Sequence, residues 1–269
     1  MKRGLLIFLL IPTLVLSQSK LKTAKENLSS RSSNSSSSTS SSNSNDDARA
    51  SSFFAQSFGY AFLELFVRAG VYSTVKLGLG DFQSRHFTPY PYYYDNVHGE
   101  YDFGSVDGDK KSLTRIGANY LVGNIVNSAE VQLEHRFTPF FGATLTHQSF
   151  FEEVRDGTEY LDVTSLSLNY YRIRERSFTG WWGAGITYAG TDVDALGFTY
   201  NLGLEVYPFK PFGIHASFQQ SFINRNTINT LRTQIKYHHK KTAFYTGYHD
   251  ISLAGVKASG VVLGVEFRW

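Results

Sequence analysis

The sequence has 269 residues, a formal net charge of +3 and a mean hydropathy of −0.23, and it contains no cysteine. The small charge, with basic residues spread along the chain, predicts no nucleic-acid partner, and the lack of cysteine excludes disulfides and a lipid-anchored N-terminal cysteine. Aromatic residues make up 16% of the chain and there are 23 glycines, which is typical of β-barrels with aromatic girdles.

Residues 1–17 have the features of a secretory signal peptide. Three residues, Met1-Lys2-Arg3, form a basic start, residues 4–16 (GLLIFLLIPTLVL) are almost wholly apolar, and small side chains precede a cleavage position before Gln18. This segment is too short for a membrane-spanning helix, and no later run approaches 18 apolar residues. We therefore predict an exported protein without transmembrane helices.

Residues 18–52 are predicted to be a disordered, Ser-rich linker. The tract 29–45 (SSRSSNSSSSTSSSNSN) has 12 serines in 17 positions. Such a composition buries too little apolar surface to offset the chain entropy that folding would cost. A spacer is the simplest role for it, and a glycosylated tract is the alternative.

Residues 53–111 form a pre-barrel segment that lacks the regular pattern of the rest. Within it, residues 53–68 (FFAQSFGYAFLELFVR) carry Phe54, Phe58, Phe62 and Leu65 at helical spacing, which indicates an amphipathic helix, with a strand as the alternative. We expect residues 69–111 to be irregular, with one short strand around residues 71–79.

From residue 112 onward the chain alternates apolar and polar residues in short segments between turn signals. This period places the two kinds of side chain on opposite faces of a sheet, as in a membrane β-barrel. We predict an all-β fold for 112–269, a closed antiparallel transmembrane up-and-down β-barrel of about ten strands, with eight or twelve as alternatives. The expected strands are 112–122, 128–137, 140–151, 163–173, 180–190, 196–207, 212–222, 229–238, 242–250 and 260–269.

The connections between these segments are expected to alternate in length. The short ones, such as 138–139 and 208–211, would be periplasmic turns, and longer ones, such as 152–160 and 251–259, would face the outside.

The chain ends on a strand with an aromatic face. Val261, Leu263, Val265, Phe267 and Trp269 share one side of it. This ending resembles the C-terminal strand of Gram-negative outer-membrane β-barrel proteins, and "EVYPFKPF" and "GYHDISLAGVKASGVVLGVEFRW" look like small Bacteroidota-type barrels. The resemblance covers residues 112–269. It implies integral insertion in the outer membrane, outer-membrane lipid and the barrel assembly machinery as partners, and Phe267 and Trp269 as the assembly signal.

The inward face of the predicted barrel carries charges of both signs. Four acids and five bases would form a paired lumen network: Arg115, Glu130, Glu134, Arg136, Glu205, Arg232, Lys236, Glu266 and Arg268. A structural salt-bridge network is the simpler interpretation. A narrow pore or a lumen that binds a small polar solute is the alternative.

The sequence contains one pair of candidate catalytic residues. His249 and Asp250, near the rim of the penultimate strand, are the candidate catalytic residues, but adjacent strand residues point to opposite faces and no nucleophile lies at a telling spacing. No metal site and no cofactor are predicted. The sequence thus favours a non-enzymatic outer-membrane barrel in envelope structure, surface interaction or limited passive transport of small solutes. The alternatives are a rim-located hydrolase or acyltransferase and a soluble secreted barrel that binds an apolar ligand.

Overall fold

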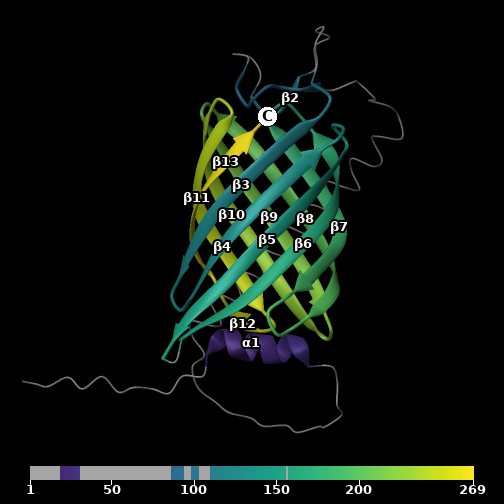
Figure 1. The fold of residues 1–269 in the computed structure, drawn as a ribbon. Coiled ribbons are helices and arrows are strands. Elements are labelled where there is room, and N and C mark those ends of the chain that lie inside the picture. The colour runs from purple at the N-terminus through teal and green to yellow at the C-terminus, as the bar shows by residue number, and fades with distance from the viewer. Residues whose placement is uncertain (1–18, 31–85, 94–97, 103–109, 156) are drawn as a thin grey trace, which may run out of the picture.

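The computed structural model describes residues 19–30, 86–93, 98–102, 110–155 and 157–269, and these form one barrel with a closing segment at each end (Figure 1). Ten long strands make the wall: β3 (Leu113–Gly123), β4 (Val126–Arg136), β5 (Phe141–Val154), β6 (Gly157–Arg174), β7 (Phe178–Ala189), β8 (Ala195–Phe209), β9 (Phe212–Ile223), β10 (Asn226–His239), β11 (Thr242–Leu253) and β13 (Gly260–Arg268).

Every wall strand pairs antiparallel with its neighbours in the chain, and the last pairs with the first. β13 lies between β11 and β3, with Val265 opposite Ala118. The remaining wall pairs run in order from β3 to β11. A two-residue strand, β12 (Val256–Lys257), adds to β11 outside the ring. The predicted fold class, a closed antiparallel ten-strand β-barrel, is confirmed.

The strands run further than the sequence indicated, and the predicted alternation of short and long loops holds only in part, because the expected long loops 152–160 and 223–228 are two-residue turns. β6 has 18 residues and its hairpin with β5 leaves only residues 155–156 outside the strands. Turns are short at both ends because the period-two pattern continues into the expected loops. The longest connections of the wall, 190–194 and 254–259, lie at the end away from the C-terminus.

The expected linker 18–52 is wrong over part of its length, because residues 20–29 form a helix. α1 (Lys20–Ser29) lies across one mouth of the barrel, which we call the α1 mouth (Figure 1). Leu21, Ala24 and Leu28 recur on its buried face. Among the described residues, no helix is long and apolar enough to cross a membrane. The signal peptide (1–17), the amphipathic segment 53–68 and the strand expected near 71–79 lie outside the described residues.

Two very short strands lie at the opposite end. β1 (His86–Phe87) pairs with β2 (Tyr101–Asp102), and Phe87 also bridges to Lys110. They lie near the end of β13, so we call this the C-terminal mouth (Figure 1). The pre-barrel segment was expected to be irregular here, and this small sheet was not foreseen.

The outer face of the wall is apolar around the whole ring. All ten wall strands contribute large hydrophobic side chains to it, and Leu168 and Leu263 are 66% and 62% exposed. Leu202, which the alternation of the predicted strand 196–207 places on this face, is nearly buried because its cross-strand neighbours are Trp182 and Phe218. Soluble monomers rarely expose so much contiguous apolar surface, so the wall is built to contact an apolar medium.

Candidate functional site

The lumen has three layers of side chains along its length. A charged layer lies at the C-terminal mouth, a chamber of hydroxyl and amide groups lies in the middle, and an apolar layer lies under α1. The candidate site is the charged layer, because it joins the wall to the described residues 86–93 and 98–102, which we call the segment 86–102.

Ion pairs cross the charged layer from wall to wall. Arg115 Nη1 on β3 lies 2.9 Å from Glu205 Oε2 on β8, and these two strands are far apart in the sheet order. Lys236 Nζ on β10 lies 3.0 Å from Glu205 Oε1 and 2.8 Å from Glu266 Oε2 on β13. The contacts therefore bridge the lumen and fill its cross-section with paired charges.

A second group in the layer centres on Arg136. Its Nε lies 2.5 Å from Glu134 Oε1, and the Tyr171 hydroxyl donates to the same oxygen at 2.9 Å. The Arg136 guanidinium also stacks over the Tyr171 ring, 3.9 Å from its centroid. These contacts fix the guanidinium, since Arg favours stacking on aromatic faces as well as pairing with carboxylates.

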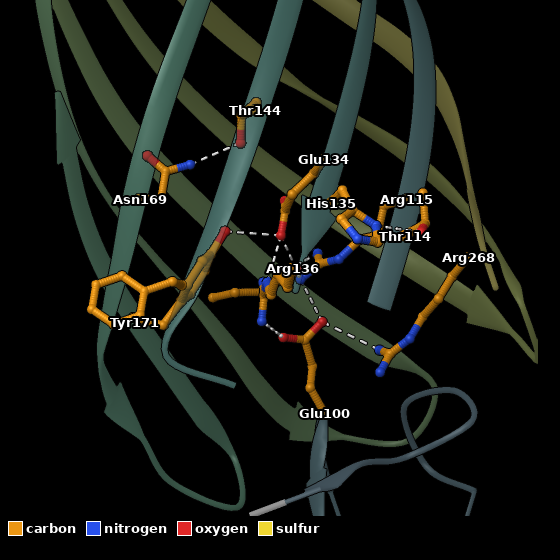
Figure 2. A network of polar contacts seen from close by, with 12 residues as sticks. Glu100, Thr114, Arg115, Glu134, His135, Arg136, Thr144, Asn169, Tyr171 and Arg268 are labelled. Atoms are coloured by element: carbon orange, nitrogen blue, oxygen red, sulfur yellow. Dashed lines mark hydrogen bonds and ion pairs between the residues drawn. The ribbon is translucent and has the colours of Figure 1, made fainter. Parts of the chain in front are cut away.

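One carboxylate from outside the wall completes the layer. Glu100 lies directly before β2 and is 1% exposed, and its carboxylate forms ion pairs with three arginines (Figure 2). Arg115 Nη2 lies 2.5 Å and Arg268 Nη1 3.2 Å from its Oε1, while Arg136 Nη1 lies 2.7 Å from its Oε2. Sequence reasoning missed Glu100, because it lies in an irregular segment with no periodic face.

Backbone contacts hold Glu100 in place. The Thr88 N–H donates to the Glu100 carbonyl at 2.9 Å, and Arg268 Nη2 donates to the Thr88 carbonyl at 2.9 Å. Gly99 has φ 144°, and a Cβ there would lie 2.0 Å from the Arg176 carbonyl oxygen. Only glycine fits at this approach. The segment is thus clamped against the wall by a few specific contacts.

The structure places all nine sequence-predicted lumen charges inside the barrel. Arg232 and Glu130 form a separate pair, with Arg232 Nη2 2.7 Å from Glu130 Oε2, and Asn119 Nδ2 donates to the other Glu130 oxygen at 2.9 Å. With Glu100 included, five acids face five bases in these two groups. The lumen charges predicted from the sequence include one more base than acids. Glu100, which lies outside the predicted strands, supplies the missing negative charge.

The pKa of Glu100 is lowered from its ordinary value. Burial alone would raise this pKa, but the charges of Arg115, Arg136 and Arg268 outweigh burial and favour the carboxylate. Glu100 therefore remains ionised in its buried position.

The α1 mouth is closed by polar anchors around an apolar contact. Glu152 accepts hydrogen bonds from the Ser19 hydroxyl at 2.8 Å and from the backbone N–H groups of Lys20 and Leu21 at 3.1 and 2.7 Å. A carboxylate at the first turn satisfies N–H groups that have no partner within the helix. The buried face of α1 packs on the apolar layer, whose large members include Leu121, Phe150, Leu161, Ile223, Ile251 and Leu253.

Lys25 fixes the middle of α1 to strand β6 and to the β7–β8 connection. Its Nζ lies 2.6 Å from Glu159 Oε2 and 3.1 Å from Asp192 Oδ2. Burial alone would lower the pKa of Lys25, but hydrogen bonds to these two carboxylates outweigh burial and raise it. Lys25 thus remains charged at neutral pH.

The chamber between the two closures is small and polar. Its volume is about 50 Å³, and hydroxyl and amide side chains such as Thr146, Ser165, Asn169 and Gln219 line it. A single water needs roughly 10–15 Å³ by the same kind of measure, so the chamber has room for only a few water-sized groups.

The candidate catalytic residues His249 and Asp250 are not brought together. His249 is fully buried in the lumen, where its Nε2 lies 2.9 Å from Gln234 Nε2. Asp250, on the other face of β11, accepts a hydrogen bond from the Ser259 hydroxyl at 2.6 Å and lies 3.5 Å from Lys257 Nζ. The alternation of side chains along a strand separates the two residues, as the sequence predicted.

A serine, a histidine and an aspartate do meet on the outer face near the α1 mouth. The Ser149 hydroxyl donates to Asp162 Oδ1 at 2.5 Å, while His147 Nε2 lies 3.4 Å from that hydroxyl. The other histidine nitrogen contacts Thr164 at 2.9 Å. In a hydrolase triad the acid orients the histidine, but here it binds the serine, so the cluster does not form that relay. Across the described ranges, no group of three or more acidic or histidine side chains could hold a metal ion.

No protein-family model and no curated protein matches the chain. Solved structures of similar fold include the N-terminal β-barrel domain of Pseudomonas aeruginosa OprF (14% identity, TM-score 0.34, covering 59% of this chain and 98% of that chain). Others are the KdgM porin (12%, 0.37, 57% and 98%) and the outer membrane protein Ail of Yersinia pestis (15%, 0.34, 59% and 99%). Likenesses this distant say nothing about which solute or partner this chain binds, and the barrel assignment rests on the pairing of its own strands.

The lowered pKa of Glu100 predicts how the segment 86–102 responds to acid. A carboxyl whose pKa is lower in the docked state than in the unfolded state stabilises the docked state. This contribution is complete above the unfolded pKa of about 4.3, and it is lost as the pH falls from there through the lower, docked-state pKa. We expect hydrogen-exchange protection of the Thr88 N–H, corrected for the intrinsic pH effect, to persist at pH 5 and to fall below about pH 4. Loss of protection between pH 7 and 5 would contradict this.

Proposed function

We propose that this chain is an integral outer-membrane β-barrel protein of a Gram-negative bacterium that has no enzymatic activity and contributes to envelope structure and surface interaction. The single observation that carries this proposal is the ring of exposed apolar side chains on all ten wall strands around a polar, filled lumen. In hydrocarbon every backbone N–H and C=O must be paired, and a closed barrel meets that requirement.

The same observation argues against a soluble barrel that binds an apolar ligand. Such a protein would turn its polar face to water and its apolar face inward. Here Ile235 and Leu263 point outward while Lys236 and Glu266 point into the lumen. The enzyme alternative at His249 and Asp250 lacks a shared face for the two groups.

The aromatic end of the chain fits outer-membrane lipid and the barrel assembly machinery as partners. The N–H and C=O of Trp269 both pair with Thr114 on the first wall strand, and the indole is 45% exposed. The Phe267 and Trp269 rings lie 6.0 Å apart on the outer face. Aromatic rings favour the membrane–water interface, so this pair supports the proposed assembly signal. The Bacteroidota type is supported by sequence alone, through residues 205–212 and 247–269.

The lumen supports a closed state over a conducting one. Cross-lumen ion pairs fill the C-terminal mouth, and α1 covers the apolar layer at the other mouth. Limited passive transport of small polar solutes is the second candidate, since the chamber between them is lined by hydroxyl and amide groups.

Conductance separates these two candidates. In planar lipid bilayers we expect the full-length protein to show no steady current above the baseline, because no charged solute can pass both closures without displacing paired groups. Stable ohmic openings of the unmodified protein would favour the transport role and contradict the closed state.

The two closures predict an asymmetric topology. The longest wall connections lie at the α1 mouth, and in outer-membrane barrels the longer loops face outward. We therefore place α1 outside the cell and the segment 86–102 in the periplasm. Since the chain has no native cysteine, single cysteines can report this. Lys22→Cys on the exposed side of α1 should react with a membrane-impermeant maleimide on intact cells.

Lys241→Cys, at the exposed β10–β11 turn of the C-terminal mouth, is the matched control. It should react only after the outer membrane is permeabilised. Labelling of Lys241→Cys on intact cells together with protection of Lys22→Cys would reverse the orientation, and labelling of both would argue against membrane insertion.

A further inference from the structure

The C-terminal mouth has the composition of an anion-binding site that is already occupied. Arg115, Arg136 and Arg268 belong to β3, β4 and β13, which are neighbours in the sheet. Each is at most 5% exposed, and all three contact the single carboxylate of Glu100. We propose that these three arginines form a carboxylate-binding site that Glu100 occupies as an intramolecular ligand, so that a free carboxylate binds there only when Glu100 is removed.

The wall by itself carries the binding groups. Strand pairing fixes the three arginine backbones, whereas Glu100 comes from a segment outside the ring. Without Glu100, the charged layer has four bases against three acids: Arg115, Arg136, Lys236 and Arg268 against Glu134, Glu205 and Glu266. A buried excess charge is costly unless it is paired. Without Glu100, this group of ion-paired wall residues therefore lacks one negative charge.

The geometry suits a carboxylate. The arginines approach both oxygens, since Arg115 and Arg268 contact Oε1 and Arg136 contacts Oε2. Arginine has a planar set of donors that matches the two oxygens of a carboxylate. A monocarboxylate also matches the single missing charge.

A small cavity beside the Glu100 carboxylate contains hydrogen-bond donors that have no partner in the described part of the chain. A cavity of about 10 Å³, enough for roughly one water-sized group, is lined by Glu100, Tyr207, His238 and Arg268 among others. The Tyr207 hydroxyl and Arg268 Nε are buried and have no hydrogen-bond partner among the described residues. Tyr207 is 1% exposed. The mouth thus holds hydrogen-bonding capacity that Glu100 does not use.

Emptying the site of its internal carboxylate tests the proposal. Glu100→Ala removes one CH₂ and the carboxylate, which leaves space for formate or acetate. Titration calorimetry of the purified full-length protein in detergent micelles, with chloride matching the ionic strength, should show saturable formate binding to this variant. A three-atom ligand at the usual ceiling of affinity per atom binds with a Kd of about 1 mM or weaker. The unmodified protein should show none, because a tethered carboxylate outcompetes a free one.

Two variants control for charge and for the position of the change. Glu100→Gln removes the charge but keeps the side-chain volume, so it should bind no formate. Glu130→Ala removes a buried lumen carboxylate outside the charged layer, which pairs with the single base Arg232. This variant should bind formate at least tenfold more weakly than Glu100→Ala, because one arginine replaces three.

Absence of formate binding in a folded Glu100→Ala protein would overturn the proposal and leave Glu100 as a structural ion-pair partner. Equal binding by Glu130→Ala would overturn it too, since the three-arginine geometry would then confer nothing. If Glu100→Ala does not fold, formate binding by the Gly99→Ala variant tests the proposal instead. Its Cβ cannot be accommodated against the Arg176 carbonyl, so the segment should leave the site and expose the same arginines to formate. None of these outcomes depends on membrane orientation or conductance.

Discussion

Pairing of the backbone between the last strand and the first is the constraint on which the structure depends. β13 pairs with β3 over its whole length, from Gly260 opposite Gly123 to Arg268 opposite Arg115. An apolar medium offers no partner to an open strand edge, and each unpaired backbone group there costs several kcal/mol. Once the ring is closed, the period of two directs every second side chain outward, and the apolar belt and the polar lumen follow together.

Closure of the ring places charged side chains in a confined lumen, where they form ion pairs that cross from one side of the wall to the other. Buried ion pairs do not guarantee stability, because desolvation offsets much of their attraction, but a partner left alone is strongly destabilising. This explains why the ring recruits Glu100 from outside its own strands. The charged layer makes the segment 86–102 part of the barrel, just as the apolar layer makes α1 part of it at the other end. The ten strands alone leave an unpaired positive charge at one mouth and an uncovered apolar layer at the other, and the two closing segments supply the missing partners.

The sequence predicted what depends on local periodicity and missed what depends on distant partners. All ten strands were found, and strand alternation placed residues such as Arg115 and Glu205 inside, because the direction of a side chain in a strand follows from its position. Leu21, Ala24 and Leu28 have helical spacing, but a ten-residue helix is marginal alone and α1 depends on Glu152, more than a hundred residues away. Glu100 lies in a segment without a period, so only an excess of one base in the lumen hinted at a missing acid. Some expected long loops are short turns because strand alternation continues through residues such as 157–162.

The claim that the outer face meets lipid is tested most directly by two arginines on that face. Leu168 and Leu196 are 66% and 63% exposed, but Leu168 lies well inside β6 and Leu196 is the second residue of β8, at the α1 mouth. An arginine deep in the lipid-facing belt of a barrel costs about 2–4 kcal/mol, and one near the interface about 0–1 kcal/mol. Reversible unfolding from lipid vesicles should therefore show a much larger loss of unfolding free energy for Leu168→Arg than for Leu196→Arg. Equal and small losses at both positions would mean that water, not hydrocarbon, surrounds the wall.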